Sequence, residues 1–251
     1  MNNLELIDVS KSFDGLKAVD QVSIGLQKGK ITALIGPNGA GKTTIFNLIS
    51  GFIKPDSGQI LYRGQNMVGL SPWEIASLGI GRLFQDVRVF SRLTVLDNVL
   101  AAFKGQKGEK VMVAILGRGK VLSEEARNKE KALELLRFVG LAEKASDLAE
   151  NLSYGQQKLL SIARLLAAEA DVLLLDEPTA GVNPAMIGQI LKVARTLAEQ
   201  GKTVVIIEHN MNVVVEVADW VYFMDDGQIV SFGLPKDVLG DPEVRRAYIG
   251  L

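Results

Sequence analysis

The feature that most constrains the fold is an apolar stretch that leads into a glycine-rich turn and then into a helical pattern. Residues 31–36 are mostly apolar, and the glycine-rich turn occupies 36–43. In the next stretch, four large apolar side chains recur at helical spacing: Ile45, Phe46, Leu48 and Ile49. Further apolar strand-like segments, at 172–175 and 203–207, are separated by a helical pattern at 185–199. Strands that alternate with helices predict an α/β fold with a mainly parallel sheet covered on both faces.

Two parts of the chain depart from this alternation. Near the N-terminus, 4–9 and 18–26 alternate apolar and polar residues, which predicts half-buried strands of a small antiparallel sheet. Between about Ser91 and Ala168 the pattern becomes helical. We therefore expect one domain, 1–251, whose catalytic core and antiparallel β subdomain occupy 1–90 and 169–251. The segment 91–168 is expected to form an inserted α-helical subdomain.

Composition narrows the class of protein further. The chain has 251 residues, 47% hydrophobic and 23% charged, which is the balance of an ordinary globular protein. The net charge of −1 excludes a global basic field that would attract nucleic acid. Because there is no cysteine and only one histidine, His209, the sequence excludes disulfides, thiolate metal sites and multi-histidine clusters. It has neither a secretory leader nor about 18 uninterrupted apolar residues, so at a membrane we expect a peripheral subunit.

The glycine-rich turn fits the Walker A pattern, in which a glycine, four residues and Gly-Lys-Thr connect a strand to a helix. Its residues are Gly36, Pro37, Asn38, Gly39, Ala40, Gly41, Lys42 and Thr43, followed by Thr44. Backbone N–H groups of such a loop close around phosphate oxygens. We expect Lys42 to contact the β- and γ-phosphates of ATP, and the Thr43 hydroxyl to bind Mg²⁺. The alternative, a turn with an incidental lysine, is disfavoured by the flanking strand and helix.

A second apolar strand ends in two carboxylates, Asp176 and Glu177. This arrangement fits the Walker B pattern, in which Asp176 holds Mg²⁺ through water and Glu177 polarises the attacking water. Phosphoryl transfer depends mainly on positioning and charge neutralisation, so one metal and one carboxylate suffice. The alternative is a pair of acidic residues that end a strand at the surface, and a Walker A loop in the same chain makes it the weaker interpretation.

The segment Leu152-Ser153-Tyr154-Gly155-Gln156-Gln157 precedes an apolar helix and lies between the two Walker patterns. It resembles the LSGGQ signature motif of ATP-binding-cassette ATPases, with Tyr154 in place of the first glycine. The resemblance implies a RecA-like P-loop core, and it implies that Ser153, Gly155 and Gln156 bind the γ-phosphate of ATP. Taken alone, Ser-x-Gly before a helix is also an ordinary N-cap.

Three further positions match this family, and a fourth departs from it. Gln85 ends a candidate strand and resembles the Q-loop glutamine, which lies near Mg²⁺ and the membrane partner. His209 follows the strand 203–207 as the switch histidine does, and Phe13 stands where family members stack an aromatic ring on adenine. Asn183 occupies the D-loop, where aspartate is usual. The alternatives are a solvated glutamine, a surface or satisfied core histidine and a core phenylalanine.

The sequences around these motifs resemble one branch of the family. They are LSYGQQK, AGVNP, IIEHNM, the stretch 84–90 and the terminal stretch 241–250. This branch comprises the ATPases of importers for branched-chain or other hydrophobic amino acids, and relatives for urea or lipopolysaccharide share part of the pattern. The basic segment Lys104–Lys120 contains an apolar run, 111–116. We interpret it as an exposed loop with one packed apolar turn, with contact to a membrane subunit or anionic headgroups as the alternative.

The resemblance implies an ATPase that powers a membrane importer, with ATP and Mg²⁺ as cofactors. Its expected partners are a second ATPase subunit, identical or related, polytopic permease subunits and, indirectly, a substrate-binding protein. Its expected place is the cytoplasmic face of the cell membrane. Two other functions stay open: a soluble cassette ATPase without a membrane partner, for example in iron–sulfur assembly, and a cassette ATPase for another cargo. A kinase with a Walker A loop would leave the signature motif unexplained.

Overall fold

The computed structural model describes residues 2–105 and 118–249, and the chain divides into two compact units. The first unit comprises Met1–Arg82, Asp171–Pro178 and Ala194–Leu251, and the second comprises Leu83–Ala170 and Thr179–Val193. The segment 91–168, for which the sequence predicts a helical insert, belongs to the second unit. Most of the basic segment Lys104–Lys120 lies outside the described residues.

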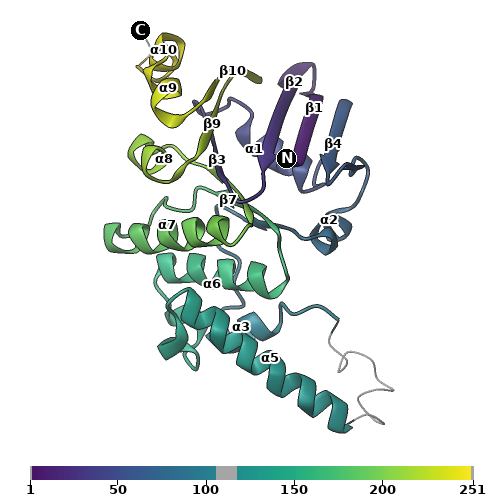
Figure 1. Ribbon diagram of the computed structural model, residues 1–251, viewed down its shortest axis with the longest axis vertical. Helices are drawn as coiled ribbons and strands as arrows, with labels where there is room; N and C mark the ends of the chain where they lie inside the picture. The colour runs from purple at the N-terminus through teal and green to yellow at the C-terminus, as the bar shows by residue number, and fades with distance from the viewer. Residues whose placement is uncertain (1, 106–117, 250–251) are drawn as a thin grey trace. The chain divides into compact units, whose positions relative to one another are not determined.

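A six-stranded sheet forms the centre of the first unit (Figure 1). Its strands are β3 (Ile31–Ile35), β6 (Ile80–Leu83), β7 (Val172–Asp176), β8 (Thr203–Ile207), β9 (Trp220–Asp225) and β10 (Gln228–Gly233), in the order β10-β9-β3-β8-β7-β6. Strand β3 pairs in parallel with β8 and β9, β7 pairs in parallel with β8, and β10 is antiparallel to β9. Strands β3, β7 and β8 are buried along their whole length, which explains their continuous apolar runs. The predicted α/β fold with a mainly parallel sheet is confirmed.

A four-stranded antiparallel sheet completes the first unit. It contains β1 (Asn2–Phe13), β2 (Leu16–Gln27), β4 (Ser57–Tyr62) and β5 (Gln65–Asn66), in the order β2-β1-β4-β5. The predicted N-terminal antiparallel sheet is therefore confirmed. Strands β1 and β2 extend beyond the predicted 4–9 and 18–26, because irregularities of register interrupt the strict alternation on which the prediction depends.

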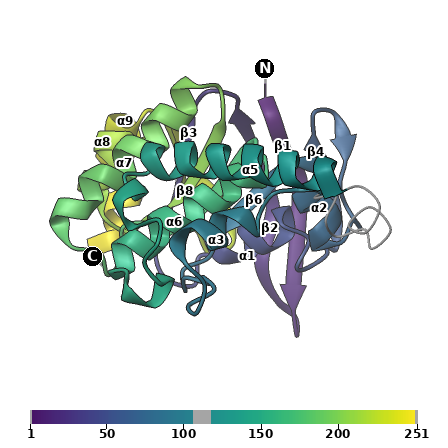
Figure 2. The same ribbon diagram turned by 90° about the horizontal axis from the view of Figure 1, so that it is seen from below.

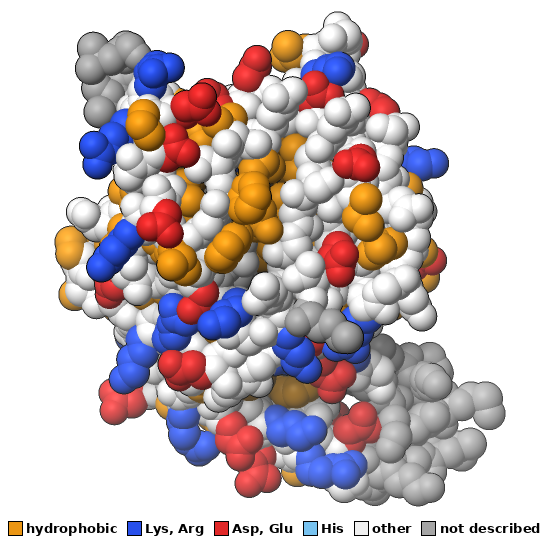
Figure 3. Space-filling view, turned by 45° about the horizontal axis from the view of Figure 1, so that its top comes forward, with side chains coloured by type: hydrophobic (Ala, Val, Ile, Leu, Met, Phe, Trp, Pro, Cys, Tyr) orange, Lys and Arg blue, Asp and Glu red, His pale blue; other side chains and the backbone are white. Residues whose placement is uncertain are grey.

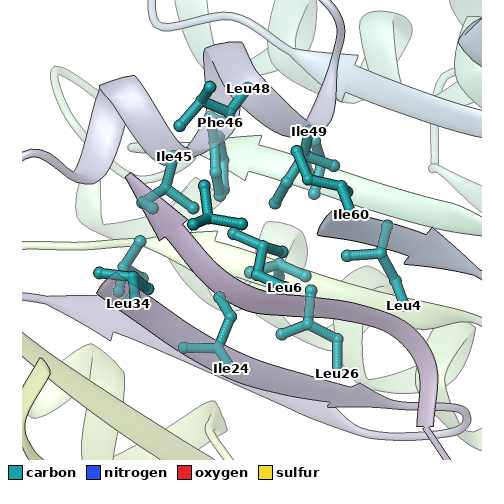
Figure 4. Packing of buried hydrophobic residues seen from close by; sticks show 14 of the residues in the cluster. Leu4, Leu6, Ile24, Leu26, Leu34, Ile45, Phe46, Leu48, Ile49 and Ile60 are labelled. Carbon is teal, nitrogen blue, oxygen red and sulfur yellow. The ribbon is translucent and has the colours of Figure 1, made fainter. Parts of the chain in front are cut away.

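Helix α1 (Lys42–Ile49) packs against residues from both sheets. Figure 4 shows its side chains Ile45, Phe46 and Ile49 in one cluster with Leu6 of β1 and Ile24 of β2. Because this cluster is buried, the start of α1 is held in place relative to both sheets. The unit also contains α2 (Pro72–Leu78), α8 (Met211–Val217), α9 (Pro235–Gly240) and α10 (Pro242–Ile249).

The second unit is helical. It contains α3 (Val95–Leu100), α5 (Arg118–Phe138), α6 (Tyr154–Ala167), the short 3₁₀ helices η2 (Ala142–Lys144) and η3 (Ala149–Asn151), and the start of α7 (Pro184–Glu199). Helices α3, α5 and α6 contact one another, as Figure 2 illustrates from below. Asn98 on α3 is fully buried, and its side chain bonds both backbone groups of Phe90 and the carbonyl oxygen of Thr94. This asparagine therefore fixes the loop that leads into α3.

On the face shown in Figure 3, no single sign of charge dominates among the residues that the structure describes. Basic and acidic side chains are interspersed on this face, in keeping with the net charge of −1. Of the helices in the described ranges, none combines the length and the apolar character needed to cross a bilayer.

Candidate functional site

The loop between β3 and α1 is shaped by close approaches of its glycine backbone. Gly36 has a φ of +148° and Gly41 a φ of +103°, values that favour glycine. A Cβ atom at Gly36 would lie 1.9 Å from the carbonyl oxygen of Met224, and one at Gly41 would lie 2.2 Å from that of Ala18. Both carbonyls belong to strands, β9 and β2, and cannot easily move away. Only glycine therefore fits these two positions of the predicted Walker A loop.

The same loop is open on another side. Gly39 has a φ of +85°, and a Cβ atom there would meet nothing within 4 Å. Asn38, Gly39 and Thr43 are exposed, whereas Ala40 is buried. Gly41 is the N-cap of α1 and has no side chain with which to cap the first-turn amides. Because N–H groups at a helix start have no partner inside the helix, this end of α1 suits an anion.

Lys42, the first residue of α1, directs its ammonium back over the loop. Its Nζ donates to the carbonyl oxygen of Gly36 at 2.8 Å and to that of Pro37 at 2.7 Å, and the residue is only 6% exposed. Burial lowers the pKa of the Lys42 ammonium, whereas the negative charges of Glu177 and Asp176 act to raise it. The loop lysine and the two predicted Walker B carboxylates therefore lie within electrostatic reach of one another.

Asp176, the last residue of β7, forms a buried ion pair with an arginine that no motif indicates. Arg82 Nη2 lies 2.8 Å from Asp176 Oδ2, and each side chain is 6% exposed. Arg82 Nη1 also donates to Asn47 Oδ1 at 2.7 Å, and the guanidinium lies 5.5 Å from the centre of the Phe46 ring. The only signal for this pair in the sequence is a charged residue within an otherwise apolar strand, since buried arginines are normally paired.

Glu177 and His209 come together although 32 positions separate them in the chain. Strands β7 and β8 are parallel neighbours, so the residues that follow them meet at the same edge of the sheet. The Glu177 N–H donates to the carbonyl oxygen of Ile207 at 3.0 Å, and Glu177 has a φ of +47°. His209 Nε2 lies 2.7 Å from Glu177 Oε1. An imidazole that donates this bond orients the Glu177 carboxylate.

Phe13 lies at the end of the β1–β2 hairpin. It is 45% exposed, which disfavours the alternative of plain core packing, and Lys11 Nζ lies 5.5 Å from the centre of its ring. Phe13 pairs with Leu16, two residues before the Ala18 carbonyl that approaches Gly41. An exposed aromatic ring on this hairpin is available to stack on a planar ligand group.

Ser153, Gly155 and Gln156 belong to the second unit and open helix α6. The Ser153 hydroxyl accepts from the Gln156 N–H at 3.4 Å, and Gln156 Oε1 accepts from the Ser153 N–H at 3.0 Å, which forms a capping box. Gly155 is buried, and a Cβ atom there would lie 2.9 Å from the Val182 side chain. The signature segment therefore packs against the start of the segment that contains Asn183.

Gln85 and Asn183 also belong to the second unit. Gln85 is exposed, and its carbonyl oxygen accepts a hydrogen bond from Tyr154 Oη at 2.8 Å. Asn183 Oδ1 accepts from the Ala185 N–H at 3.0 Å at the start of α7, which is a capping contact that asparagine and aspartate make equally well. The departure from aspartate at this position therefore leaves the local structure intact.

Known proteins resemble the chain along its whole length. The family model described as ABC transporter matches residues 19–180. The probable branched-chain amino acid transport ATP-binding protein LivG of Archaeoglobus fulgidus is 40% identical over 250 residues, which cover 100% of this chain and 96% of the relative. The high-affinity branched-chain amino acid transport ATP-binding protein LivG of Escherichia coli is 38% identical and aligns over 95% of this chain and 94% of the relative.

Solved structures resemble the chain equally closely. A nucleotide-free ATP-binding cassette from an ABC transporter has 36% identity and a TM-score of 0.86, and the match covers 100% of both chains. The ADP conformation of a cassette of an ABC transporter has 35% identity and a TM-score of 0.85, again over 100% of both chains.

The buried Arg82–Asp176 pair yields a prediction about stability. Arg82→Leu leaves a buried carboxylate without its cation and should lower the free energy of unfolding by about 3–5 kcal/mol. Arg63→Leu is the matched control, because Arg63 pairs with Asp171 but its side chain is 58% exposed, and it should cost less than about 1 kcal/mol. Urea unfolding followed by tryptophan fluorescence measures both, since Trp73 and Trp220 lie in the first unit.

A second change isolates the charge from the packing of Arg82. Adding Asp176→Asn to Arg82→Leu removes the unpaired carboxylate and should recover part of the lost stability. Equal losses for Arg82→Leu and Arg63→Leu would contradict the view that the pair is a buried structural element.

Proposed function

Because the chain belongs to the ABC transporter family of ATP-binding proteins, we propose that it hydrolyses ATP to power a membrane importer of branched-chain or other hydrophobic amino acids. The observation that carries the catalytic part is the 2.7 Å contact between Glu177 and His209, in the same unit as the loop lysine. This contact supports the assignment of Glu177 as the general base and of His209 as the phosphate sensor.

The loop from Gly36 to Thr44 binds the phosphates of ATP. The N–H groups of the first turn of α1 donate to phosphate oxygens, and the open side of Gly39 lets these oxygens approach the backbone closely. Lys42 adds a full positive charge. In this structure its ammonium contacts two loop carbonyls, and it leaves them to bind the phosphates. The exposed ring of Phe13 stacks on adenine.

The donor groups near this loop fit Mg²⁺. In the first unit, the Thr43 hydroxyl and the Asp176 carboxylate offer oxygen atoms, which are the ligands that Mg²⁺ prefers. The resemblance to the family would add the Gln85 amide, which belongs to the second unit. When bound, Mg²⁺ supplies positive charge that offsets the charge of the phosphate oxygens. Arg82 holds the Asp176 carboxylate in one orientation through a bond at 2.8 Å.

Glu177 acts as the general base that accepts a proton from the attacking water. His209 orients the Glu177 carboxylate through their 2.7 Å contact and senses the γ-phosphate. In the second unit, Ser153 and the N–H groups near Gly155 open α6 and offer donors to the γ-phosphate of an ATP bound by a partner cassette. Two cassettes, identical or related, therefore close around two ATP molecules.

The proposal for the cargo and the membrane partners rests on the names of the relatives. The relatives that align over nearly the full chain are named as branched-chain amino acid transport ATP-binding proteins. By analogy, this chain works as a peripheral subunit on the cytoplasmic face of the membrane, with polytopic permease subunits and, indirectly, a substrate-binding protein.

Reconstitution tests the cargo. In proteoliposomes with the permease subunits and the binding protein, leucine should stimulate ATP hydrolysis and its own uptake, whereas urea should do neither. A chain that copurifies with no membrane subunit would contradict the proposed membrane partners. An assembly whose ATP hydrolysis and uptake do not respond to hydrophobic amino acids would contradict the proposed cargo.

Two substitutions separate ATP binding from hydrolysis. Glu177→Gln should bind ATP normally and slow hydrolysis by at least about a hundredfold, because a neutral amide cannot accept the proton. Lys42→Ala should lose most of its ATP affinity as well, because the phosphates lose their main side-chain cation. Fluorescent-nucleotide titration and phosphate release measure the two properties. The exposed residues Glu199 and Lys236 give matched controls, Glu199→Gln and Lys236→Ala, which should change neither.

The trans position of Ser153 yields a prediction about assembly. Glu177→Gln should form an ATP-dependent dimer, because slow hydrolysis preserves the closed state. Adding Ser153→Glu should keep ATP binding by the monomer but abolish the dimer, because a carboxylate repels the γ-phosphate held by the partner. Size-exclusion chromatography with light scattering measures the mass. A dimer in the double variant would exclude the trans contact.

A further inference from the structure

The segment that follows β6 is held by side chains of two helices of its own unit, α3 and α6. On α6, Tyr154 Oη donates to the carbonyl oxygen of Gln85 at 2.8 Å, and Arg164 Nη1 donates to the carbonyl oxygen of Arg88. On α3, buried Asn98 fixes the backbone at the far end of the segment. Side chains of α3 and α6 therefore hold residues 85–90 along their length, and Tyr154 holds the end that carries Gln85.

Tyr154 also contacts a third segment of the same unit. Its ring centre lies 5.0 Å from Lys158 Nζ, and this fully buried ammonium donates to the carbonyl oxygen of Ala180 at 3.0 Å. A Cβ atom added at Gly181 would lie 3.5 Å from the Tyr154 ring, so the ring lies close to the backbone of this turn. Tyr154 thus bonds the Gln85 backbone directly and is linked to the 180–181 turn through Lys158.

We propose that Tyr154 is a positioning residue that ties Gln85 to the start of the signature helix, so that Gln85 and Ser153 move as one body. The usual glycine at this position has no side chain and cannot form this bond. The roles of Gln85 and Ser153 toward ATP rest on the proposed function, whereas the bond between Tyr154 and Gln85 does not.

The size of the effect follows from the nature of the bond. Tyr154 is 39% exposed, so water competes for its hydroxyl and the net contribution is that of one ordinary hydrogen bond. Such a bond supports a change of about two- to tenfold in the opening of the segment that it holds. Tyrosine has only two side-chain torsions, which keeps the entropic cost of the bond low.

Hydrogen exchange tests the bond in the full chain without nucleotide. Tyr154→Phe keeps the ring over Lys158 and Gly181 and removes only the hydroxyl. We expect amides in 84–90 to exchange about two- to tenfold faster in this variant. Tyr222→Phe is the matched control, because Tyr222 Oη also donates to a backbone carbonyl, that of Gly25 at 3.3 Å, but in the first unit. It should leave 84–90 unchanged.

Three results of this experiment would overturn the proposal. The first is unchanged exchange of 84–90 in Tyr154→Phe. The second is exchange at the rate of an unfolded peptide already in the wild-type chain, because such a segment is not held. The third is faster exchange in Tyr154→Gly but not in Tyr154→Phe, which would assign the holding to the ring instead of the hydroxyl.

A double-mutant cycle tests whether the bond acts through Gln85. Tyr154→Phe should lower kcat about two- to tenfold and leave KM for ATP unchanged, because the loop that binds the phosphates is in the first unit. In a Gln85→Ala background the same change should have no further effect on kcat, since the held side chain is gone. Additive losses would mean that Tyr154 acts through another contact, and the proposal would fail.

Hydrogen exchange and the kinetic cycle together distinguish a failure of this inference from a failure of the proposed function. A wild-type chain that does not hydrolyse ATP would refute the proposed function while the exchange results still decide the bond. Active wild-type protein with unchanged exchange in Tyr154→Phe would refute the inference alone.

Discussion

The shape of the loop between β3 and α1 depends on two backbone carbonyls that leave no room for a side chain. A Cβ atom at Gly36 would lie 1.9 Å from the Met224 oxygen, and one at Gly41 would lie 2.2 Å from the Ala18 oxygen. Met224 belongs to the six-stranded sheet, whereas Ala18 belongs to the antiparallel sheet. Both sheets are therefore needed to shape one loop, which gives the small N-terminal sheet a role beyond covering the core. The buried cluster around Phe46 keeps α1 aligned with this loop.

Parallel strand order brings the charged groups to one edge of the first unit. Asp176 ends β7, Glu177 follows it, and His209 follows β8, so pairing of these strands brings Glu177 and His209 together without any local sequence signal. Such an edge gathers negative charge, and the structure offsets it with cations from two different elements. Arg82 pairs with Asp176 inside the sheet, and Lys42 lies within reach of both carboxylates. Buried charges that are balanced in this way cost less than an isolated carboxylate would.

Local patterns in the sequence predicted the parts of the fold that depend on local chemistry. Continuous apolar runs indicated β3, β7 and β8, because strands buried on both faces need no polar residues. The glycine spacing indicated the loop, because its backbone conformation excludes side chains. The sequence could not predict that Arg82 pairs with Asp176, since 94 positions separate them and no motif contains the arginine. Nor could the sequence predict that the Tyr154 hydroxyl bonds the Gln85 carbonyl, since 69 positions separate these residues.

The two compact units divide the proposed site chemistry between them. The first holds the loop, Lys42, Asp176, Glu177 and His209, and the second holds Gln85, Ser153 and Asn183. Under the proposed function, ATP binding then needs only the first unit, whereas hydrolysis needs groups from both. Hydrogen bonds inside the second unit decide whether its groups move independently or together. A tyrosine in place of a flexible glycine adds such a bond at the first turn of α6 and favours concerted movement. A chain with glycine at this position lacks the side chain that makes this bond, so no bond from this position would tie its glutamine to the first turn of the helix.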